Sequence, residues 1–205
     1  MLVVVGGHSR NIGKTSVVAG LIRKLKDRPW TALKITQYGN GFCSHHGVAC
    51  GCEPEPDQPF ALSEEFEANR TDTGRFLAAG AERSFWLRVP TGELASAQAT
   101  VSKILAQGQN AIVESNSVLE LVEPDIFLML LDFSCQDFKA SSLRFMDRAD
   151  AFVVIDRGGI NAPMWEEVAR GMWDHKPQFP VKPPNYVTPA LAGFVRSMLA
   201  LSSSR

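Results

Sequence analysis

Cysteine and tyrosine are scarce in this sequence of 205 residues, which contains four cysteines and two tyrosines. Four cysteines in a chain of this length are too few for the disulfide scaffold that holds small secreted domains together. Long apolar runs are also missing, because the longest are Leu2–Val5 and Ile126–Leu131. A transmembrane helix needs about 20 apolar residues. The sequence therefore predicts neither a disulfide-rich domain nor a membrane-spanning protein.

An excess of charge of one sign is absent too. The chain has 21 basic and 22 acidic residues, for a formal net charge of -1. This balance gives no electrostatic reason to expect nucleic acid or an anionic membrane as the main partner, so a small molecule is expected instead. The first residues lack the basic segment, apolar stretch and cleavage site of a secretory signal, so we expect a cytoplasmic location.

The composition, with 45% hydrophobic and 21% charged residues, is that of an ordinary globular protein and excludes the disordered, collagen and coiled-coil classes. The length predicts one domain over residues 1–205. Strands are expected at Leu2–Val5, Thr31–Thr36, Ser84–Val89, Asn110–Glu114, Asp125–Leu131 and Ala151–Ile155. Helices are expected at Lys14–Asp27, Leu62–Ala68, Thr73–Ala79, Gly92–Ala106, Ala162–Trp173 and Thr188–Leu201. This alternation predicts a three-layer α/β fold, with a mostly parallel central sheet and helices on both faces.

Two segments break the alternation. Tyr38–Pro59 is rich in Gly, Pro, Cys and His and has no sustained periodicity, which predicts an insertion at about residues 38–60. Pro177–Pro189 contains several prolines and predicts an irregular connection before the last helix.

The segment Gly6–Thr15, GGHSRNIGKT, joins the first predicted strand to the first predicted helix. In that position its backbone N–H groups can surround a β-phosphate, and Lys14 can reach the β- and γ-phosphates. The hydroxyl of Thr15 can bind Mg²⁺. The sequence therefore predicts a P-loop that binds ATP or GTP with Mg²⁺. Its predicted nucleotide-binding residues are Ser9, Arg10, Asn11, Ile12, Gly13, Lys14 and Thr15.

The spacing of this loop departs from the general P-loop pattern, which has four residues between its two glycines. That spacing falls on His8, whereas counting from Gly7 leaves five residues before Gly13. The five-residue spacing followed by Gly-Lys-Thr resembles the loops of dethiobiotin synthetase and cobyrinic acid amide synthase. Position 9 is serine, where the dimerising ATPases with a deviant loop carry a second lysine, so that branch is set aside. These features resemble the SIMIBI class of P-loop NTPases.

Two further blocks, Asp72–Arg75 (DTGR) and Ala79–Glu82 (AGAE), resemble the MobB family, molybdopterin-guanine dinucleotide biosynthesis protein B. The resemblance covers about Leu2 to Asp132. It implies that the strand before the P-loop is central in the sheet. It also assigns nucleotide and Mg²⁺ roles to Lys14, Thr15, Lys34, Asp72 and Glu114. The family's His-rich stretch after the second strand is not reproduced, so the exact function does not transfer.

Three of these residues also have an interpretation of their own. Glu114 ends a strand at the edge where a parallel sheet binds ligands, so it is either a Mg²⁺ ligand or a solvated strand end. Asp72 either binds Mg²⁺ or caps the helix that follows. Lys34 lies inside an apolar strand, as a phosphate or substrate ligand or as a lysine whose amine reaches the surface. We predict Lys14, Lys34 and Glu114 as catalytic residues and Thr15, Asp72 and Glu114 as Mg²⁺ ligands.

The predicted insertion gathers three thiols and two imidazoles within ten residues, namely Cys43, His45, His46, Cys50 and Cys52. Zn²⁺ accepts thiolate and neutral imidazole, and closing four ligands around it would supply folding free energy. An iron–sulfur cluster, with Cys135 as a further ligand, is the rival interpretation. The spacing fits neither a paired Cys-x-x-Cys nor a ferredoxin pattern, so a substrate lid with reduced cysteines stays open.

These observations favour a P-loop protein that uses the γ-phosphate of a nucleotide, by phosphoryl transfer or hydrolysis, on or beside a small-molecule substrate. An NTPase, a kinase and an ATP-dependent ligase all fit this description. One alternative is a non-enzymatic, MobB-like adaptor in cofactor biosynthesis. Another is a metal-binding or redox module. A homodimer and a partner enzyme both stay open as assembly partners.

Overall fold

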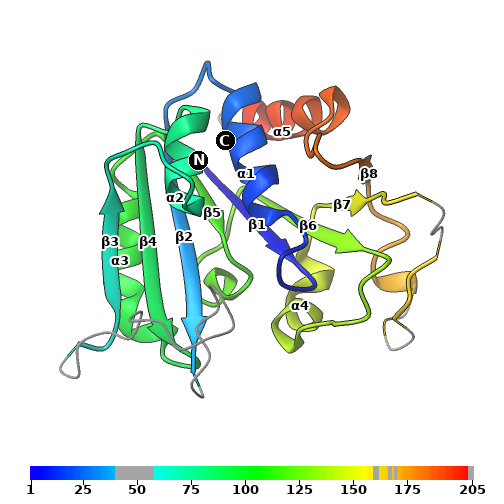
Figure 1. Ribbon diagram of the computed structural model, residues 1–205, viewed down its shortest axis with the longest axis horizontal. Helices are drawn as coiled ribbons and strands as arrows, with labels where there is room; N and C mark the ends of the chain where they lie inside the picture. The colour runs from blue at the N-terminus through cyan, green and yellow to red at the C-terminus, as the bar shows by residue number, and fades with distance from the viewer. Residues whose placement is uncertain (40–57, 159–161, 166–167, 169, 203–205) are drawn as a thin grey trace.

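The computed structural model describes residues 1–39, 58–158, 162–165, 168 and 170–202 (Figure 1). Within these residues, eight strands form one sheet in the order β3-β4-β2-β5-β1-β6-β7-β8. Neighbouring strands pair in parallel, except that β3 runs antiparallel to β4. The strands are β1 (Leu2–Gly7), β2 (Trp30–Tyr38), β3 (Ala61–Glu65), β4 (Arg83–Pro90), β5 (Asn110–Glu114), β6 (Ile126–Asp132), β7 (Ala151–Ile155) and β8 (Gln178–Val181).

Helices cover both faces of this sheet. The buried side chains of α1 (Lys14–Lys24), α2 (Asp72–Ala79) and α5 (Pro189–Ser202) belong to one hydrophobic cluster. Those of α3 (Gln98–Leu105) and α4 (Ala140–Phe145) belong to another. Short 3₁₀ helices lie at Leu94–Ala97, Ser117–Glu120, Met146–Arg148 and Arg170–Met172. The predicted α/β fold, with a mostly parallel sheet between two helical layers, is confirmed.

The central strand β1 follows from its run of valines. Val3, Val4 and Val5 are fully buried, and Val4 belongs to one core cluster while its two neighbours belong to the other. A strand flanked by sheet on both edges and helices on both faces takes such a continuous β-branched run. The carboxyl end of β1, and the loop that follows it, therefore lie at the middle of the sheet edge.

Helix α1 forms because its apolar residues recur at helical spacing. Val17, Val18, Leu21 and Ile22 are fully buried, whereas Arg23 and Lys24 are exposed in the last turn. Basic residues there complement the negative end of the helix dipole.

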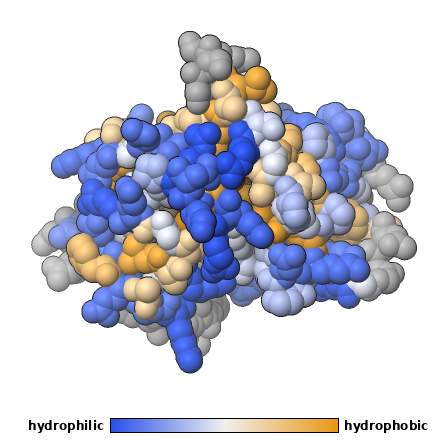
Figure 2. All heavy atoms as spheres, turned by 90° about the horizontal axis from the view of Figure 1, so that it is seen from above, coloured by the Kyte–Doolittle hydropathy of each residue, from blue (hydrophilic) through white to orange (hydrophobic). Residues whose placement is uncertain are grey.

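In the view from above, hydrophilic residues gather down the middle of the molecule (Figure 2).

Three expectations about the elements are wrong. Leu62–Ala68 was expected to be helical, but residues 61–65 form β3, an edge strand paired with β4. The connection Pro177–Pro189 contains a strand, β8, at the opposite edge of the sheet. The helix expected at Ala162–Trp173 does not form in the part of that stretch that the structure describes, where the only helical turn is Arg170–Met172. Trp165 and Trp173 are nevertheless buried, and their rings pack against that of Phe133.

None of the helices in the described ranges combines the length and the apolar character that crossing a membrane requires. Residues 40–57, most of the predicted insertion, lie outside the described residues, and the five Cys and His residues predicted to bind a metal lie there with them.

Candidate functional site

The loop between β1 and α1 has the backbone form of an anion cradle. Asn11 and Gly13 both adopt left-handed conformations, with φ of 56° and 106°. Alternation of left- and right-handed residues turns successive N–H groups inward, toward one point. Glycine is required at position 13, because a Cβ there would lie 2.3 Å from Cε1 of Tyr186. Asn tolerates the left-handed region better than most residues, which explains its place at position 11.

His8, which occupies the position of the first glycine in the general pattern, points away from this cradle. Its side chain is fully buried and packs against the rings of Phe138 and Trp165, which also contact each other; the centroid distances from the imidazole are 5.0 and 4.7 Å. The backbone N–H of Asp132 donates to Nε2 at 3.0 Å, so the hydrogen is on Nδ1, which donates to the carbonyl of Asp137 at 3.0 Å. Burial lowers the pKa of His8 to about 4, so the imidazole is neutral.

Asn116 holds the other end of the loop. Its Oδ1 accepts a hydrogen bond from the backbone N–H of Gly7 at 2.8 Å, and its Nδ2 donates to the carbonyl of Gly7 at 3.0 Å. Ser142 Oγ donates to the same carbonyl at 2.8 Å. Asn116 also lines the cavity described below, and its side chain caps no helix.

Lys14 and Thr15 begin α1 at the floor of the cradle. Lys14 Nζ donates to the carbonyl of Ser9 at 2.9 Å. Burial lowers the pKa of Lys14, and the nearby charge of Glu114 opposes that shift. Thr15 Oγ1 donates to Oε2 of Glu114 at 2.8 Å. The hydroxyl and the carboxylate that the sequence predicts as Mg²⁺ ligands are thus in direct contact.

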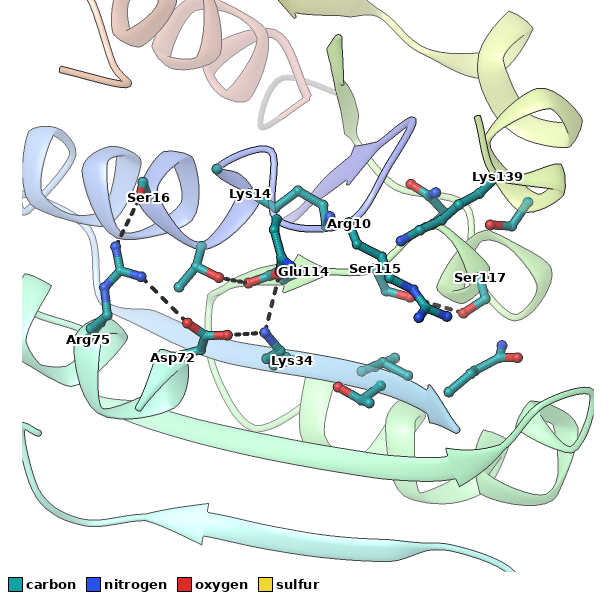
Figure 3. Close-up of a pocket in the computed structure, with 18 of the residues that line it drawn as sticks. Arg10, Lys14, Ser16, Lys34, Asp72, Arg75, Glu114, Ser115, Ser117 and Lys139 are labelled. Carbon is teal, nitrogen blue, oxygen red and sulfur yellow. Dashed lines mark hydrogen bonds and ion pairs between the residues drawn. The ribbon is translucent and has the colours of Figure 1, made fainter. Parts of the chain in front are cut away.

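Lys34 lies between two carboxylates, as Figure 3 shows. Its Nζ donates to Oδ2 of Asp72 and lies 3.4 Å from Oε1 of Glu114. Lys34 and Glu114 face each other because β2 and β5 pair them in register. Burial disfavours the charged lysine, but the two carboxylates outweigh burial and raise the pKa of Lys34. The alternative of a lysine that reaches the surface is wrong, since its side chain is only 14% exposed.

Asp72 is the first residue of α2 and not its cap. The hydroxyl of Thr71 caps the helix by accepting from the N–H of Gly74 at 3.0 Å. The carboxylate of Asp72 is therefore directed to Lys34, and its other oxygen lies 3.5 Å from Arg75. Burial favours the neutral acid, but Lys34 outweighs it and lowers the pKa of Asp72. Arg75 also donates to Oγ of Ser16 at 2.9 Å, which ties α2 to α1.

A cavity of about 760 Å³ unites these groups. Its lining is mostly polar and carries five cations, from Arg10, Lys14, Lys34, Arg75 and Lys139. Burial, together with the nearby charges of Lys14 and Arg10, lowers the pKa of Lys139 to about 7. An anion bound here would meet positive charge from several directions.

Most of the predicted site residues come together at this cavity. Its lining includes Arg10, Asn11, Gly13, Lys14, Thr15, Lys34, Asp72 and Glu114. Two predicted residues turn their side chains elsewhere: Ser9 donates to Oδ2 of Asp137 at 2.5 Å, and Ile12 is buried in the core. Only their backbone groups are available to the cradle.

Among the cavity residues that the sequence did not single out are Lys139, Arg75 as a side chain, and Tyr186. They come from the loop before α4, from α2 and from the segment before α5. No local pattern marks them, because only the packing of distant segments brings them to the loop after β1. In the described parts of the chain, no group of three or more His, Cys, Asp or Glu side chains is arranged to hold a metal ion.

A mostly parallel sheet between helices is also found in a solved structure, so the comparisons with known proteins agree with the α/β fold. No family model and no curated protein matches the chain. HypB from Helicobacter pylori, in complex with nickel, is 15% identical, with a TM-score of 0.51 over 96% of this chain and 85% of HypB. LpxK from Aquifex aeolicus, in complex with ATP, is 16% identical, with a TM-score of 0.48 over 87% of this chain.

The chain spans 53% of LpxK, about half its length. At 15% identity the likeness to HypB concerns the fold alone. The resemblance to MobB is a finer statement that the comparisons do not show, so it stays a prediction.

Proposed function

We propose that the protein binds a nucleoside triphosphate with Mg²⁺ at the loop Ser9–Thr15. It uses the γ-phosphate, by phosphoryl transfer or hydrolysis, on or beside a small polar molecule. One observation carries this proposal. The left-handed residues Asn11 and Gly13 shape a cradle whose floor holds Lys14 and the contact between Thr15 and Glu114. Such a backbone cradle at a helix N-terminus favours phosphate groups.

Lys14 supplies the positive charge for the polyphosphate. Its ammonium rests on the carbonyl of Ser9, a neutral acceptor that a phosphate oxygen would replace. Burial lowers its pKa, and a bound polyphosphate would stabilise the protonated form and reverse this effect. Binding would therefore tighten the clamp on the anion that it neutralises.

The donor set around Thr15 fits Mg²⁺. Mg²⁺ prefers oxygen ligands, and here a hydroxyl and the carboxylates of Glu114 and Asp72 adjoin the cradle. When bound, the ion would neutralise phosphate charge as that charge shifts during transfer. Lys34 pairs with both carboxylates and lowers the pKa of Asp72, and Mg²⁺ would compete with its ammonium for them. The same lysine is the predicted catalytic cation beside the γ-phosphate.

Replacing Lys14 tests this proposal. We expect millimolar ATP or GTP with Mg²⁺ to raise the melting temperature of the protein, because a ligand that binds only the folded state stabilises it. Lys14→Ala should lose that rise. Lys24→Ala, which removes an exposed lysine at the other end of the same helix, is the matched control and should keep it. Equal stabilisation of the Lys14→Ala variant and the control would remove the nucleotide assignment.

Turnover separates the enzyme from the adaptor. An enzyme of this design releases phosphate, or transfers it to an acceptor, at a rate that depends on Lys14. Tight binding with almost no hydrolysis across a panel of small acceptors would favour the MobB-like adaptor. The metal-binding or redox alternative depends on residues outside the described ranges, and it predicts function that survives the loss of Lys14.

A further inference from the structure

The cations of the cavity are not equivalent, because some already have anionic partners. Lys34 is paired with Asp72 and Glu114, and Arg75 is paired with Asp72. Lys14 rests on a carbonyl in the cradle. Arg10 and Lys139 form no ion pair with any residue in the described part of the chain, although both line the cavity. Arg10 is exposed to solvent and Lys139 is half-buried, so both side chains are available to pair with an anion that enters the cavity.

Arg10 and Lys139 lie at one end of the cavity, which we call the Arg10–Lys139 end. In Figure 3, Arg75 and Ser16 lie at one end, Lys14 lies between, and Lys139 and Ser117 lie at the other end. The side chain of Arg10 reaches past Ser115 toward Ser117, and Lys139 points into the same region. The polyphosphate cradle and the Arg10–Lys139 end are therefore neighbours within one cavity.

Hydroxyl groups also line the Arg10–Lys139 end of the cavity. Oγ of Ser115 and Oγ of Ser117 lie 3.1 Å apart, and the N–H of Val118 donates to Ser115 at 3.3 Å, which fixes that side chain. Ends of neighbouring strands add Thr36, Gln37 and Thr91 to the lining. Among the described residues that line the cavity, the larger apolar side chains are those of Ile35, Ala140 and Tyr186, so this part of the lining offers no extended apolar surface. A lipid tail or a bare aromatic ring would find little to pack against.

We propose that Arg10 and Lys139, with Ser115 and Ser117, form a subsite for the anionic group, phosphate or carboxylate, of a small polar acceptor. This inference rests on the proposed function, because it gives the second molecule a place beside the γ-phosphate. The Arg10 guanidinium provides a planar pair of donors, and Lys139 provides a point charge. Lys139 has its pKa lowered by burial and by two neighbouring cations, and a bound anion relieves that repulsion.

The volume is consistent with two ligands. A cavity of about 760 Å³ lies in the upper part of the range for small-molecule sites, which is about 300–1,000 Å³. The acceptor's anion would be held at one end while its reactive group faces Lys14 and the cradle. Orienting two reactants in this way is the main contribution that a phosphoryl-transfer site makes.

The experiment saturates the protein with a non-hydrolysable triphosphate analogue and Mg²⁺, and then titrates sulfate or malonate while recording the melting temperature. Sulfate represents a phosphate group and malonate a carboxylate, so the tighter probe identifies the kind of anion. We expect one of them to raise the melting temperature further. Arg10→Gln/Lys139→Gln should weaken that binding by about tenfold or more, the usual effect of losing charged hydrogen bonds.

The matched control is Arg70→Gln/Lys103→Gln, which removes two exposed positive charges that do not line the cavity. It should bind the probes as the unaltered chain does, because screening by salt suppresses distant charges. Competition between the probe and the analogue would overturn the subsite, since the anion would then belong to the cradle. An equal loss of probe binding in the control, or no loss in the cavity variant, would overturn it too.

Failure of the proposed function would be seen separately. If no triphosphate binds, the same sulfate and malonate titrations are made on Lys14→Ala protein without nucleotide. If Arg10→Gln/Lys139→Gln then weakens probe binding, the result supports the subsite independently of the nucleotide. If these substitutions leave probe binding unchanged, the result overturns it.

Discussion

His8 shows how a single residue can depart from a motif without weakening the site. A glycine at that position would leave the N–H of Asp132 and the carbonyl of Asp137 without their imidazole partner. The histidine instead joins the loop between β1 and α1 to the loop after β6, and the N–H of Lys139 donates to the carbonyl of His8 at 2.8 Å. The sequence shows that His8 departs from the pattern. It does not show why, because the hydrogen-bond partners of the imidazole lie more than 120 residues further along the chain.

The neutral state of His8 makes stability depend on pH. Its pKa is lowered to about 4 in the folded state, so the unfolded chain binds a proton first as pH falls. The contribution of His8 to the free energy of unfolding should be constant above about pH 6.5 and should decrease below it, by up to about 3 kcal/mol near pH 4. Urea unfolding between about pH 6.5 and 5 measures this slope before most carboxylates titrate.

Substitution isolates the contribution of His8. His8→Phe keeps a ring against Phe138 and Trp165 but cannot titrate, so its stability should be flat over that pH range. It should also be less stable near neutral pH, by about 1–3 kcal/mol, because two buried backbone groups lose a partner. His175→Gln, at an exposed position, should keep the slope. A wild-type protein with no slope, or a His8→Phe variant with the full slope, would contradict this account.

Helices and strands were predictable where local pattern and tertiary environment agree. The positions of β5 and β7 were predicted because short apolar runs fill strands buried on both faces. β3 was mistaken for a helix because its sequence ALSEE contains good helix formers, yet pairing with β4 decides its conformation. In this pair of strands, Oε1 of Glu64 lies 2.7 Å from Nε of Arg83. β8 was missed because Pro180 interrupts it, although an edge strand tolerates proline.

The start of α2 gives a test at the level of an element, because this helix presents Asp72 to the site. Thr71→Ala removes the side-chain acceptor for the N–H of Gly74 and should cost about 1 kcal/mol of unfolding free energy. Thr71→Ser keeps a hydroxyl and should lose much less. Urea denaturation of the two variants makes the comparison, and equal losses would mean that Thr71 does not act through its hydroxyl.

The architecture of the whole molecule explains why the predicted residues converge and why others were missed. The loop Ser9–Thr15 follows the central strand β1, and Glu114 ends the adjacent strand β5 beside Lys34 of β2. Parallel strands place their carboxyl ends together, so residues named one by one in the sequence meet at one edge. Lys139 and Tyr186 reach the same cavity through loops whose paths no local pattern specifies.

A crystal structure of the full chain with a non-hydrolysable triphosphate and Mg²⁺ tests the central claim most directly. The account predicts a polyphosphate enclosed by the backbone N–H groups from Ser9 to Gly13. Nζ of Lys14 should have moved from the carbonyl of Ser9 to the phosphate oxygens, with the metal beside Thr15 and Glu114. A nucleotide bound elsewhere, or a loop that leaves no room for phosphate at saturating ligand, would contradict it.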